Sequence, residues 1–290
     1  MAYTKKEFNG PSFSSKELSE RWDRAVSHSE HFKQTEPTIT DIHYKKVVWN
    51  LLKRLVPKPA GKKILKLDLY NEATGTTHAG YFVQNSAKIY GIDISFKINH
   101  QAKLKCGHQI LGSQGDVRNL PFKSESFDVI FSLGTLEHVQ DADQPITIKE
   151  LFRVLKPGGI CILGVNNRYS LWLTPLLFEF LEWTGLIREQ WSYEPTYPPS
   201  HLKWLYRQQG FEKIRNDGTL LFPKWFRVYD MWSASRRGPI FNLMNRIKNL
   251  LYQPLVWGIE KLENFRILNY FADQTLTIGI KPAKVNHAVK

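Results

Sequence analysis

Polar residues that could take part in chemistry follow a short apolar run, Phe127 to Phe131. Ser132 comes directly after this run, and Glu137 and His138 follow a few residues later. The imidazole of His138 has an unperturbed pKa close to neutrality, so it could act as a general base or simply shape a pocket. We interpret Glu137 as a structural carboxylate or a carboxylate of a pocket wall. No spacing typical of a metal site is present, so we expect no metal.

A second candidate for chemistry ends another apolar run, Lys88 to Ser95. Asp93 stands where a carboxylate suits a ribose, because two vicinal hydroxyls can donate to it. The alternative is that Asp93 caps the helix that follows. Nicotinamide-dependent enzymes share this signal, but no G-x-G-x-x-G follows the first predicted strand, which counts against a dehydrogenase.

The elements that must position these residues form a strand, a helix and a second strand. The strands are predicted at Phe127 to Phe131 and Ile160 to Val165, and Lys156 to Gly159 should end the helix between them. Short joints of this kind indicate a parallel sheet, whose ligands bind at the carboxyl ends of the strands. We therefore expect Ser132 to His138 and Asn166 to Ser170 on the functional rim.

The sequence motifs of this segment resemble those of a known family. F-D-V-I-F-S, L-E-H-V and E-L-F-R-V-L-K-P-G-G together resemble class I S-adenosylmethionine (SAM) dependent methyltransferases, and most of all the type 11 branch with the ubiquinone and menaquinone methyltransferases. The resemblance covers about Lys62 to Asn167, with a weaker echo at Leu202 to Phe211 and Thr275 to Pro282. It implies an α/β fold: a Rossmann-like, seven-stranded, mostly parallel sheet with helices on both faces. An N-terminal helical extension and a helical insertion before the last strand would be added to it.

The resemblance also implies the co-substrate and the residues of the site. The co-substrate would be SAM, without a metal. The residues expected around the cofactor are Asp68, Gly75, Asp93, Ile94, Asp116, Val117, Ser132 and Leu133. Within this set Ile94 would pack on the adenine, and Asp116 and Val117 would meet its edge, although Asp116 could equally be a simple turn aspartate. The acceptor pocket would be formed by Glu137, Asn167, Arg168 and Tyr169.

The first turn departs from the family pattern. Family members have a glycine-rich turn there, which lets the backbone come close to the methionyl end of the cofactor. Here Tyr70 and Glu72 stand where the first two glycines belong, and only Gly75 can serve as the last. The chain therefore has either an altered but working cradle or a domain that has lost the cofactor. We favour the working cradle, because the other cofactor positions are intact.

Composition limits the class of protein. The 290 residues carry a formal net charge of +13, with 42% hydrophobic and 23% charged residues, which describes a globular protein. The charge indicates an anionic partner or simply a lysine-rich surface. Cys106 and Cys161 fall in no metal or redox spacing and suit a reducing compartment. Met1 to Gly10 is polar, so we expect no signal peptide and a cytoplasmic protein.

The chain divides into four predicted parts. Residues 1–59 form an N-terminal helical extension, 60–218 the SAM-binding core, 219–272 a basic, aromatic helical cap, and 273–290 the last strand and tail. In the extension, Ser14-x-x-Glu17 has the form of a capping box. A second helix is expected over Asp41 to Leu55, with five side chains inward: Ile42, Val48, Leu51, Leu52 and Leu55.

Two apolar segments bear on the acceptor. Leu171 to Ile187 is shorter than the ~20 residues that span a bilayer and holds Glu179 and Glu182, so we expect it to line an acceptor pocket or lie on a membrane surface. Thr219 to Leu250 holds six Lys or Arg and one acid, Asp230. A helix face is predicted there from Phe241, Leu243, Met244, Ile247, Leu250 and Leu251. It suits an anionic membrane surface or lipid-like substrate, or RNA, or a packed cap.

Taken together, the sequence predicts a SAM-dependent methyltransferase acting on a small or lipid-like acceptor, with peripheral association at the inner membrane surface. An RNA methyltransferase is the first alternative, although no N-P-P-Y-like tetrapeptide is present. A non-catalytic binding protein on the same fold is the second, because of the altered first turn.

Overall fold

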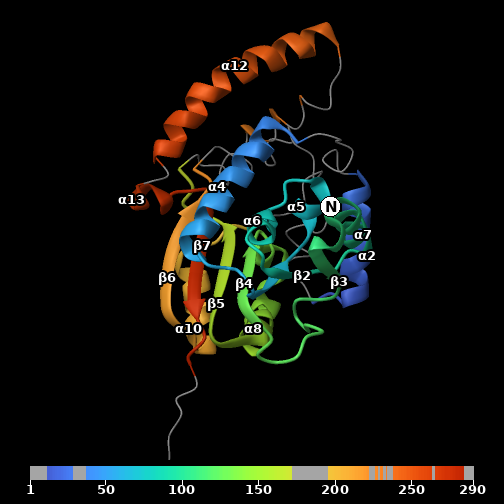
Figure 1. Ribbon diagram of the computed structural model, residues 1–290, viewed down its shortest axis with the longest axis vertical. Helices are drawn as coiled ribbons and strands as arrows, with labels where there is room; N and C mark the ends of the chain where they lie inside the picture. The colour runs from blue at the N-terminus through green and yellow to red at the C-terminus, as the bar shows by residue number, and fades with distance from the viewer. Residues whose placement is uncertain are drawn as a thin grey trace, which may run out of the picture.

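The computed structural model describes residues 12–28, 37–171, 195–221, 226–227, 229–230, 233, 238–262 and 265–283. At its centre lies a seven-stranded sheet with the order β3-β2-β1-β4-β5-β7-β6 (Figure 1). Neighbouring strands run parallel except at β7, which is antiparallel to both β5 and β6. The predicted Rossmann-like, mostly parallel sheet is confirmed.

The strands are β1 (Lys63–Leu67), β2 (Lys88–Asp93), β3 (Ile110–Gln114), β4 (Phe127–Leu133), β5 (Leu155–Asn166), β6 (Glu212–Thr219) and β7 (Gln274–Ile280). The helix between β4 and β5, α8 (Gln144–Val154), ends before the proline and glycines that were predicted to end it. Lys156 to Gly159 belong to β5, where the register against β4 shifts between Phe127 and Val129. These residues therefore form an irregularity in the strand rather than a helix-ending turn.

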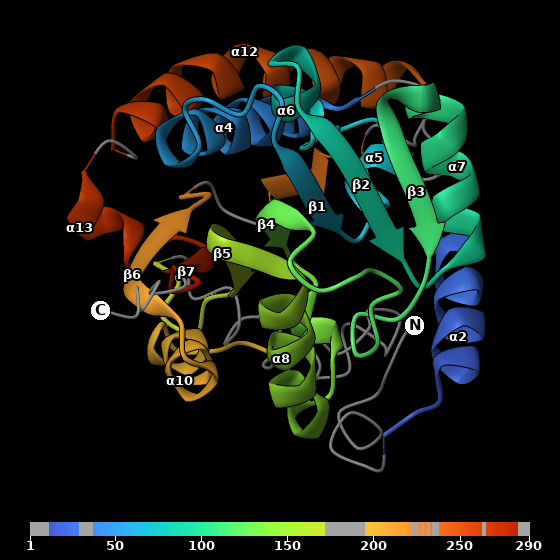
Figure 2. The same cartoon turned by 60° about the horizontal axis from the view of Figure 1, so that its bottom comes forward.

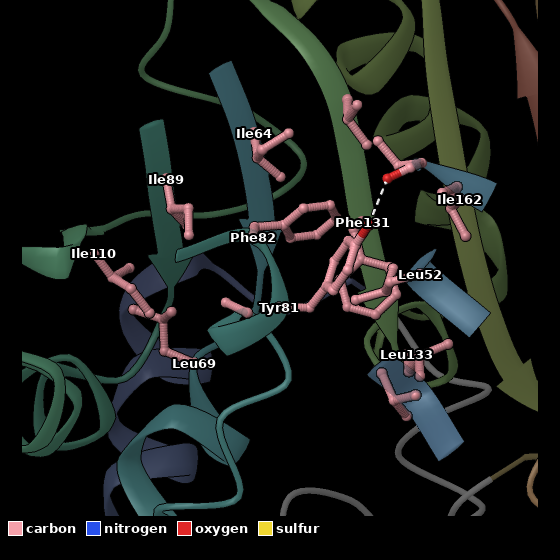
Figure 3. Packing of buried hydrophobic residues seen from close by; sticks show 14 of the residues in the cluster. Leu52, Ile64, Leu69, Tyr81, Phe82, Ile89, Ile110, Phe131, Leu133 and Ile162 are labelled. Carbon is pink, nitrogen blue, oxygen red and sulfur yellow. Dashed lines mark hydrogen bonds between the residues drawn. The ribbon is translucent and has the colours of Figure 1, made fainter. Parts of the chain in front are cut away.

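The other helices are α2 (Ser15–His28), α4 (Ile39–Leu55), α5 (Tyr70–Thr74), α6 (Gly80–Gln84), α7 (Phe96–Cys106), α10 (Ser200–Gln209), α12 (Pro239–Leu262) and α13 (Arg266–Asn269). A hydrophobic core lies on each face of the sheet, between the strands and the helices that cover them, because alternate residues of a strand point to opposite faces. Ile64 of β1 belongs to the core that includes Phe82 of α6 and Leu52 of α4, as Figure 3 shows. Leu65 belongs to the other core, which α8 and α10 cover. Full burial of such a side chain contributes about 1.5–3 kcal/mol.

The N-terminal helices begin with the local signals that the sequence carries. Ser14 and Glu17 exchange hydrogen bonds in the predicted capping box. Helix α4 begins two residues before the predicted start, with a second capping box between Thr38 and Asp41. The prediction that Ile42 points inward is wrong: its side chain is 57% exposed, because α4 turns its neighbour Asp41 toward the interior.

The insertion between β6 and β7 contains the expected long helix. α12 lies alongside α4 in Figures 1 and 2, and its buried side chains Tyr252, Val256 and Ile259 share a small core with Tyr44 and Val47 of α4. The helix predicted within Leu171 to Ile187 lies, from residue 172, outside the described residues. In the part of the chain that the structure describes, no helix combines the length and apolarity needed to cross a membrane.

Candidate functional site

The candidate site lies at the edge of the sheet where β1, β2 and β4 end. Asp68 follows β1 directly, Asp93 is the last residue of β2, and Ser132 lies one residue before the end of β4. Because β7 is antiparallel, its first residue, Gln274, lies at the same edge, paired with Asn166 at the end of β5. The parallel topology thus brings together polar residues that are far apart in the sequence.

Asp93 is nearly buried and keeps acceptor capacity. Its Oδ2 accepts the backbone N–H of Leu69 at 2.8 Å, and its Oδ1 accepts that of Ser95 at 2.9 Å. Burial raises the pKa of Asp93 to about 7. Each oxygen has a further lone pair, so the carboxylate can accept two more donors, as a ribose diol requires. The cap of helix α7 is Ser95, whose hydroxyl accepts the N–H of Ile98, and not Asp93.

Asp68 joins the end of β1 to the turn after β4. Its φ of 54° lies in the left-handed region that glycine adopts without strain. The Oδ2 atom accepts the hydroxyl of Thr135 at 2.8 Å, the ammonium of Lys66 at 3.1 Å and the hydroxyl of Ser132 at 3.3 Å. A carboxylate with this set of donors is fixed in place.

Lys66 brings a buried positive charge to the same place. Its ammonium donates to the carbonyls of Leu67 and Asp68, and lies 3.7 Å from Oε2 of Glu72. Burial lowers the pKa of Lys66, but Asp68 and Glu72 outweigh it and the pKa is raised. Burial raises the pKa of Glu72, whose contact with Lys66 is longer. An ion cluster of Lys66, Asp68 and Glu72 therefore stands in the first turn, where the family has glycines.

The first turn, between β1 and α5, is short. Only Asp68 and Leu69 separate β1 from α5, and Glu72 is buried in the first turn of that helix, where its Oε1 accepts the N–H of Ala79 at 2.9 Å. Gly75 ends α5 with a φ of 93° and lines a cavity of about 340 Å³ beside Trp49 of α4. Gly75 thus acts as a helix cap, which is the common use of glycine at that position.

An adenosyl group fits this edge through Asp93, whose spare lone pairs match a ribose. The methionyl end would meet the ion cluster instead of bare backbone. Asp68, Glu72 and Asp93 offer three carboxyl groups against the one ammonium of Lys66. That balance suits a cofactor with a net positive charge.

Asp116 is held in a second ion cluster. Its oxygens accept Nε and Nη2 of Arg118 at 2.7–3.1 Å and the hydroxyl of Ser15 at 2.7 Å. Arg118 also donates to Asp143 at 2.7 Å. Burial raises the pKa of Asp116, but the hydrogen bonds from Arg118 outweigh it and the pKa is lowered. Val117 packs against the core under α8 and α10.

Helix α2 covers the expected adenosine positions (Figure 2). Besides the contact of Ser15 with Asp116, Leu18 packs against Ile94. The ring of Trp22 meets His138 edge to face, with centroids 4.9 Å apart. Further along the helix, Asp23 accepts the N–H of Lys97 at 3.1 Å. The N-terminal extension is therefore a wall of the site.

The turn after β4 carries the candidate acceptor residues. Glu137 is 2% exposed, and its Oε1 would lie 3.5 Å from a Cβ added at Gly134. Nε2 of Gln274 would lie 3.7 Å from the same Cβ. The backbone of Gly134, with a φ of 88°, therefore lies close to both the carboxyl of Glu137 and the amide of Gln274. Leu133 is buried beside it.

The residues after β5 lie at the rim of the sheet edge that carries the site. Asn167 is buried, and its amide donates to the carbonyls of Tyr270 and Ala272 at 2.9 and 2.8 Å. Arg168 and Tyr169 are exposed, and Tyr169 stacks on Tyr270 with centroids 6.2 Å apart. Asn167 thus ties the rim to the segment before β7.

Several residues of the site were not predicted: Lys66, Thr135, Trp22 and Gln274. Lys66 could have been found, because a lysine inside an apolar strand is buried only when it is paired. The other three carry no sequence signal, since they reach the site through tertiary packing. Within the described residues, no group of three or more His, Cys, Asp or Glu side chains could hold a metal.

Comparison with known proteins shows which sequences and folds this chain is similar to. Residues 73–163 match a family described as a methyltransferase domain. A methyltransferase of Synechocystis named as uncharacterized is 34% identical over 136 residues, which are 47% of this chain and 61% of that protein. A demethylmenaquinone methyltransferase of Staphylococcus haemolyticus is 26% identical over 68% of this chain and 84% of its own length. A 2-methyl-6-phytyl-1,4-hydroquinone methyltransferase of rice is 29% identical over 39% of this chain, which spans only 30% of that protein.

Solved structures show the same fold. A SAM-dependent methyltransferase of Thermotoga maritima, titled a possible histamine N-methyltransferase, has a TM-score of 0.54 at 19% identity and covers 90% of this chain and 98% of its own. A 4+2 cyclase reaches 0.56 at 14% identity, over 94% and 98% of the two chains. The fold alone therefore does not specify the reaction. Residues 73–163 thus match a methyltransferase domain, and the chain shares its fold with solved SAM-dependent methyltransferases.

Proposed function

We propose that this chain transfers a methyl group from SAM to a lipid-like acceptor of the hydroquinone type. The observation that carries the proposal is the pair of neighbouring carboxylates, Asp68 and Asp93, at the strand ends of a methyltransferase domain. The acceptor class is supported by relatives named for demethylmenaquinone and a phytyl hydroquinone. Residues 60–218 with 273–290 would form the catalytic core, and 1–59 and 219–272 would cover it.

The proposed roles follow from the contacts. Asp93 would hold the ribose and Ile94 one face of the adenine, with Val117 and the fixed Asp116 at its edge. Ser132 and Leu133 would line the methyl-transfer site with the carboxylate of Asp68, and Gly75 would contribute only through the end of α5. Glu137 would face the acceptor, with Arg168 and Tyr169 at the mouth that Asn167 shapes.

The chemistry needs alignment more than activation. SAM, when bound, would supply a methyl group on a sulfonium, and the sulfur would keep the electron pair of the broken C–S bond as the thioether of S-adenosylhomocysteine. Helix α2 would exclude water from the cofactor side, and the turn at Gly134 would hold the acceptor in line. A hydroquinone loses one proton as it is methylated. His138 is the proposed base, since its imidazole lies in this turn beside Trp22.

The test is transfer of labelled methyl from SAM by the purified chain. Reaction mixtures contain a hydroquinone with an isoprenoid tail, the same ring without a tail, or total RNA. We expect label in the tailed lipid, with less in the short ring. Label in RNA would favour the alternative to which the net charge of +13 points. No transfer to any of the three would contradict the proposal.

The role of His138 has its own test. If its imidazole takes the proton, His138→Asn lowers kcat by about 10²–10⁴ with little change in KM, and removes the fall of kcat on the acid side of the pH profile. His108→Asn, a change of an exposed histidine, is the matched control. A loss below about tenfold, with the pH profile intact, would reduce His138 to a pocket wall.

A further inference from the structure

We infer that the outer side of α12 is a docking surface for an anionic lipid bilayer. Its exposed aliphatic side chains, here called the α12 face, are Ile240, Leu243, Ile247, Leu250, Leu251 and Leu255. Their exposed fractions run from 44% to 76%. The spacing of three and four residues places them on one side of the helix.

The α12 face is distinct from the side of the helix that packs on the protein. Tyr252, Val256 and Ile259, which contact α4, are between 3% and 8% exposed. Gly258, on the outer side, has no atom within 4 Å of a Cβ placed on it. One apolar side of α12 packs on the protein, and the second apolar side remains exposed to solvent. An exposed apolar patch of this kind marks an interaction site.

The charges beside the α12 face select the partner. In α4 and α12, the partly or fully exposed charged side chains are seven cations and one acid: Lys45, Lys46, Lys53, Arg54, Arg246, Lys248 and Lys261 against Glu260. Arg54 pairs with Asp217, and Lys248 pairs with Asp230. Glu260 already pairs with Lys46 at 2.9 Å. Cations beside an apolar helix face are the pattern of a helix lying in the interface of an anionic membrane. RNA is a poorer match, because leucine and isoleucine offer no ring on which a base could stack.

A cavity lies between α4, the C-terminal part of α12 and the end of β6. It measures about 430 Å³ and is lined by Val47 and Leu51 of α4, Trp257 of α12, and Gly218 and Thr219. The last two end β6, which runs parallel to β5 through their shared antiparallel neighbour β7, so the cavity lies at the same sheet edge as the site. Docking through the α12 face would thus bring this edge to the membrane. The inference deepens the proposed function, since a lipid-like acceptor would come from that membrane.

The experiment is sedimentation of the full chain with vesicles, without SAM or acceptor, so that its failure is separate from a failure of methyl transfer. Vesicles of phosphatidylcholine are compared with vesicles that also contain phosphatidylglycerol. We expect binding to the anionic vesicles, and at least about a tenfold loss in Leu250→Glu/Leu251→Glu. Leu104→Glu is the matched control, since this leucine of α7 is 65% exposed and lies outside the α12 face.

The second variant separates charge from apolar contact. Arg246→Glu should weaken binding to anionic vesicles several-fold and leave binding to neutral vesicles unchanged. The inference is overturned if the wild type binds no vesicles, or if Leu250→Glu/Leu251→Glu binds like the wild type. It is also overturned if the wild type binds no vesicles but is a dimer that this variant converts to a monomer, because a second copy would then cover the face.

Discussion

At the scale of single residues, Asp93 links cofactor binding to pH. Its pKa of about 7 means that the carboxyl takes up a proton as the pH falls through neutrality. A protonated carboxyl is a weaker acceptor for ribose hydroxyls. We therefore predict that affinity for S-adenosylhomocysteine, the product form of SAM, falls below pH ~7 by up to about tenfold per unit. Titration calorimetry over this range measures it, with Asp93→Asn as the variant whose affinity should be low at every pH.

The same shift has an opposite effect on the ligand-free protein. The folded state holds the proton of Asp93 up to pH about 7, whereas the unfolded state releases it near the ordinary value of 3.8. The folded protein therefore binds more protons between these values, and the contribution of Asp93 to the free energy of unfolding falls as the pH rises.

An affinity for S-adenosylhomocysteine that does not change across neutrality would contradict the placing of Asp93 on the ribose.

Lys66 is the residue on which the altered turn depends. Lys66→Met leaves the buried Glu72 and the partly buried Asp68 without their cation, so we predict a loss of about 3 kcal/mol or more in the free energy of unfolding. Lys66→Met/Glu72→Gln should recover part of it, because one uncompensated carboxylate is removed. Urea unfolding measures both.

Lys156→Met is the control for Lys66. It breaks a half-exposed pair with Asp128 at 2.8 Å, and such pairs contribute only about 0–1 kcal/mol. Equal losses for the two lysines would show that the ion cluster of Lys66 is not a buried, dependent unit.

At the scale of elements, the junction of β1 and β2 sets the position of Asp93. A Cβ added at Gly91 of β2 would lie 2.5 Å from Cδ2 of Leu69, the residue whose N–H binds Asp93. We predict that Gly91→Ala costs about 1–3 kcal/mol of unfolding free energy and weakens S-adenosylhomocysteine binding, because Leu69 must move.

Gly258 of α12 is the matched control for Gly91. Its added Cβ meets nothing within 4 Å, and alanine is the better helix former, so Gly258→Ala should stabilise by up to about 1 kcal/mol. Thermal and urea unfolding of both variants measure this contrast. Binding that survives Gly91→Ala unchanged would separate the turn from the site.

Elements with strong local signals were predictable. The apolar run at Phe127, the periodic helix after it and the strand from Ile160 are decided by burial, which the sequence records directly. The capping boxes at Ser14 and Thr38 are local in the same way, although only the first was predicted. Helix α8 ends just before Lys156 to Gly159, but the sequence did not show that these residues belong to the following strand. They form an irregularity in β5, in which Gly158 and Gly159 exchange backbone hydrogen bonds with Lys281.

At the scale of the whole molecule, the seven-stranded, mostly parallel sheet followed from the resemblance, and the edge that carries the site followed from the predicted parallel strands. What the sequence could not supply were contacts between distant segments. The packing of Leu18 on Ile94, of Trp22 on His138 and of Gln274 beside Gly134 depends on how separate elements meet. The sequence also did not determine that the α12 face points outward, since an amphipathic pattern does not say which side of a helix meets solvent.

In the whole molecule, α2 lies beside the expected cofactor positions, and α4 and α12 lie beside the proposed acceptor side. Carboxylates gather at the strand ends, and cations on the two outer helices. This division of charge would suit the proposed cationic cofactor at the sheet edge and the proposed anionic surface at α12.

The measurement that tests the central claim most directly is calorimetric titration of the folded full chain with S-adenosylhomocysteine at pH about 8, where Asp93 is ionised. We predict saturable binding of one molecule per chain and at least about tenfold weaker binding by Asp93→Ala. A folded wild-type chain that takes up no S-adenosylhomocysteine would show that Lys66, Asp68 and Glu72 have closed the cradle, and would contradict the account.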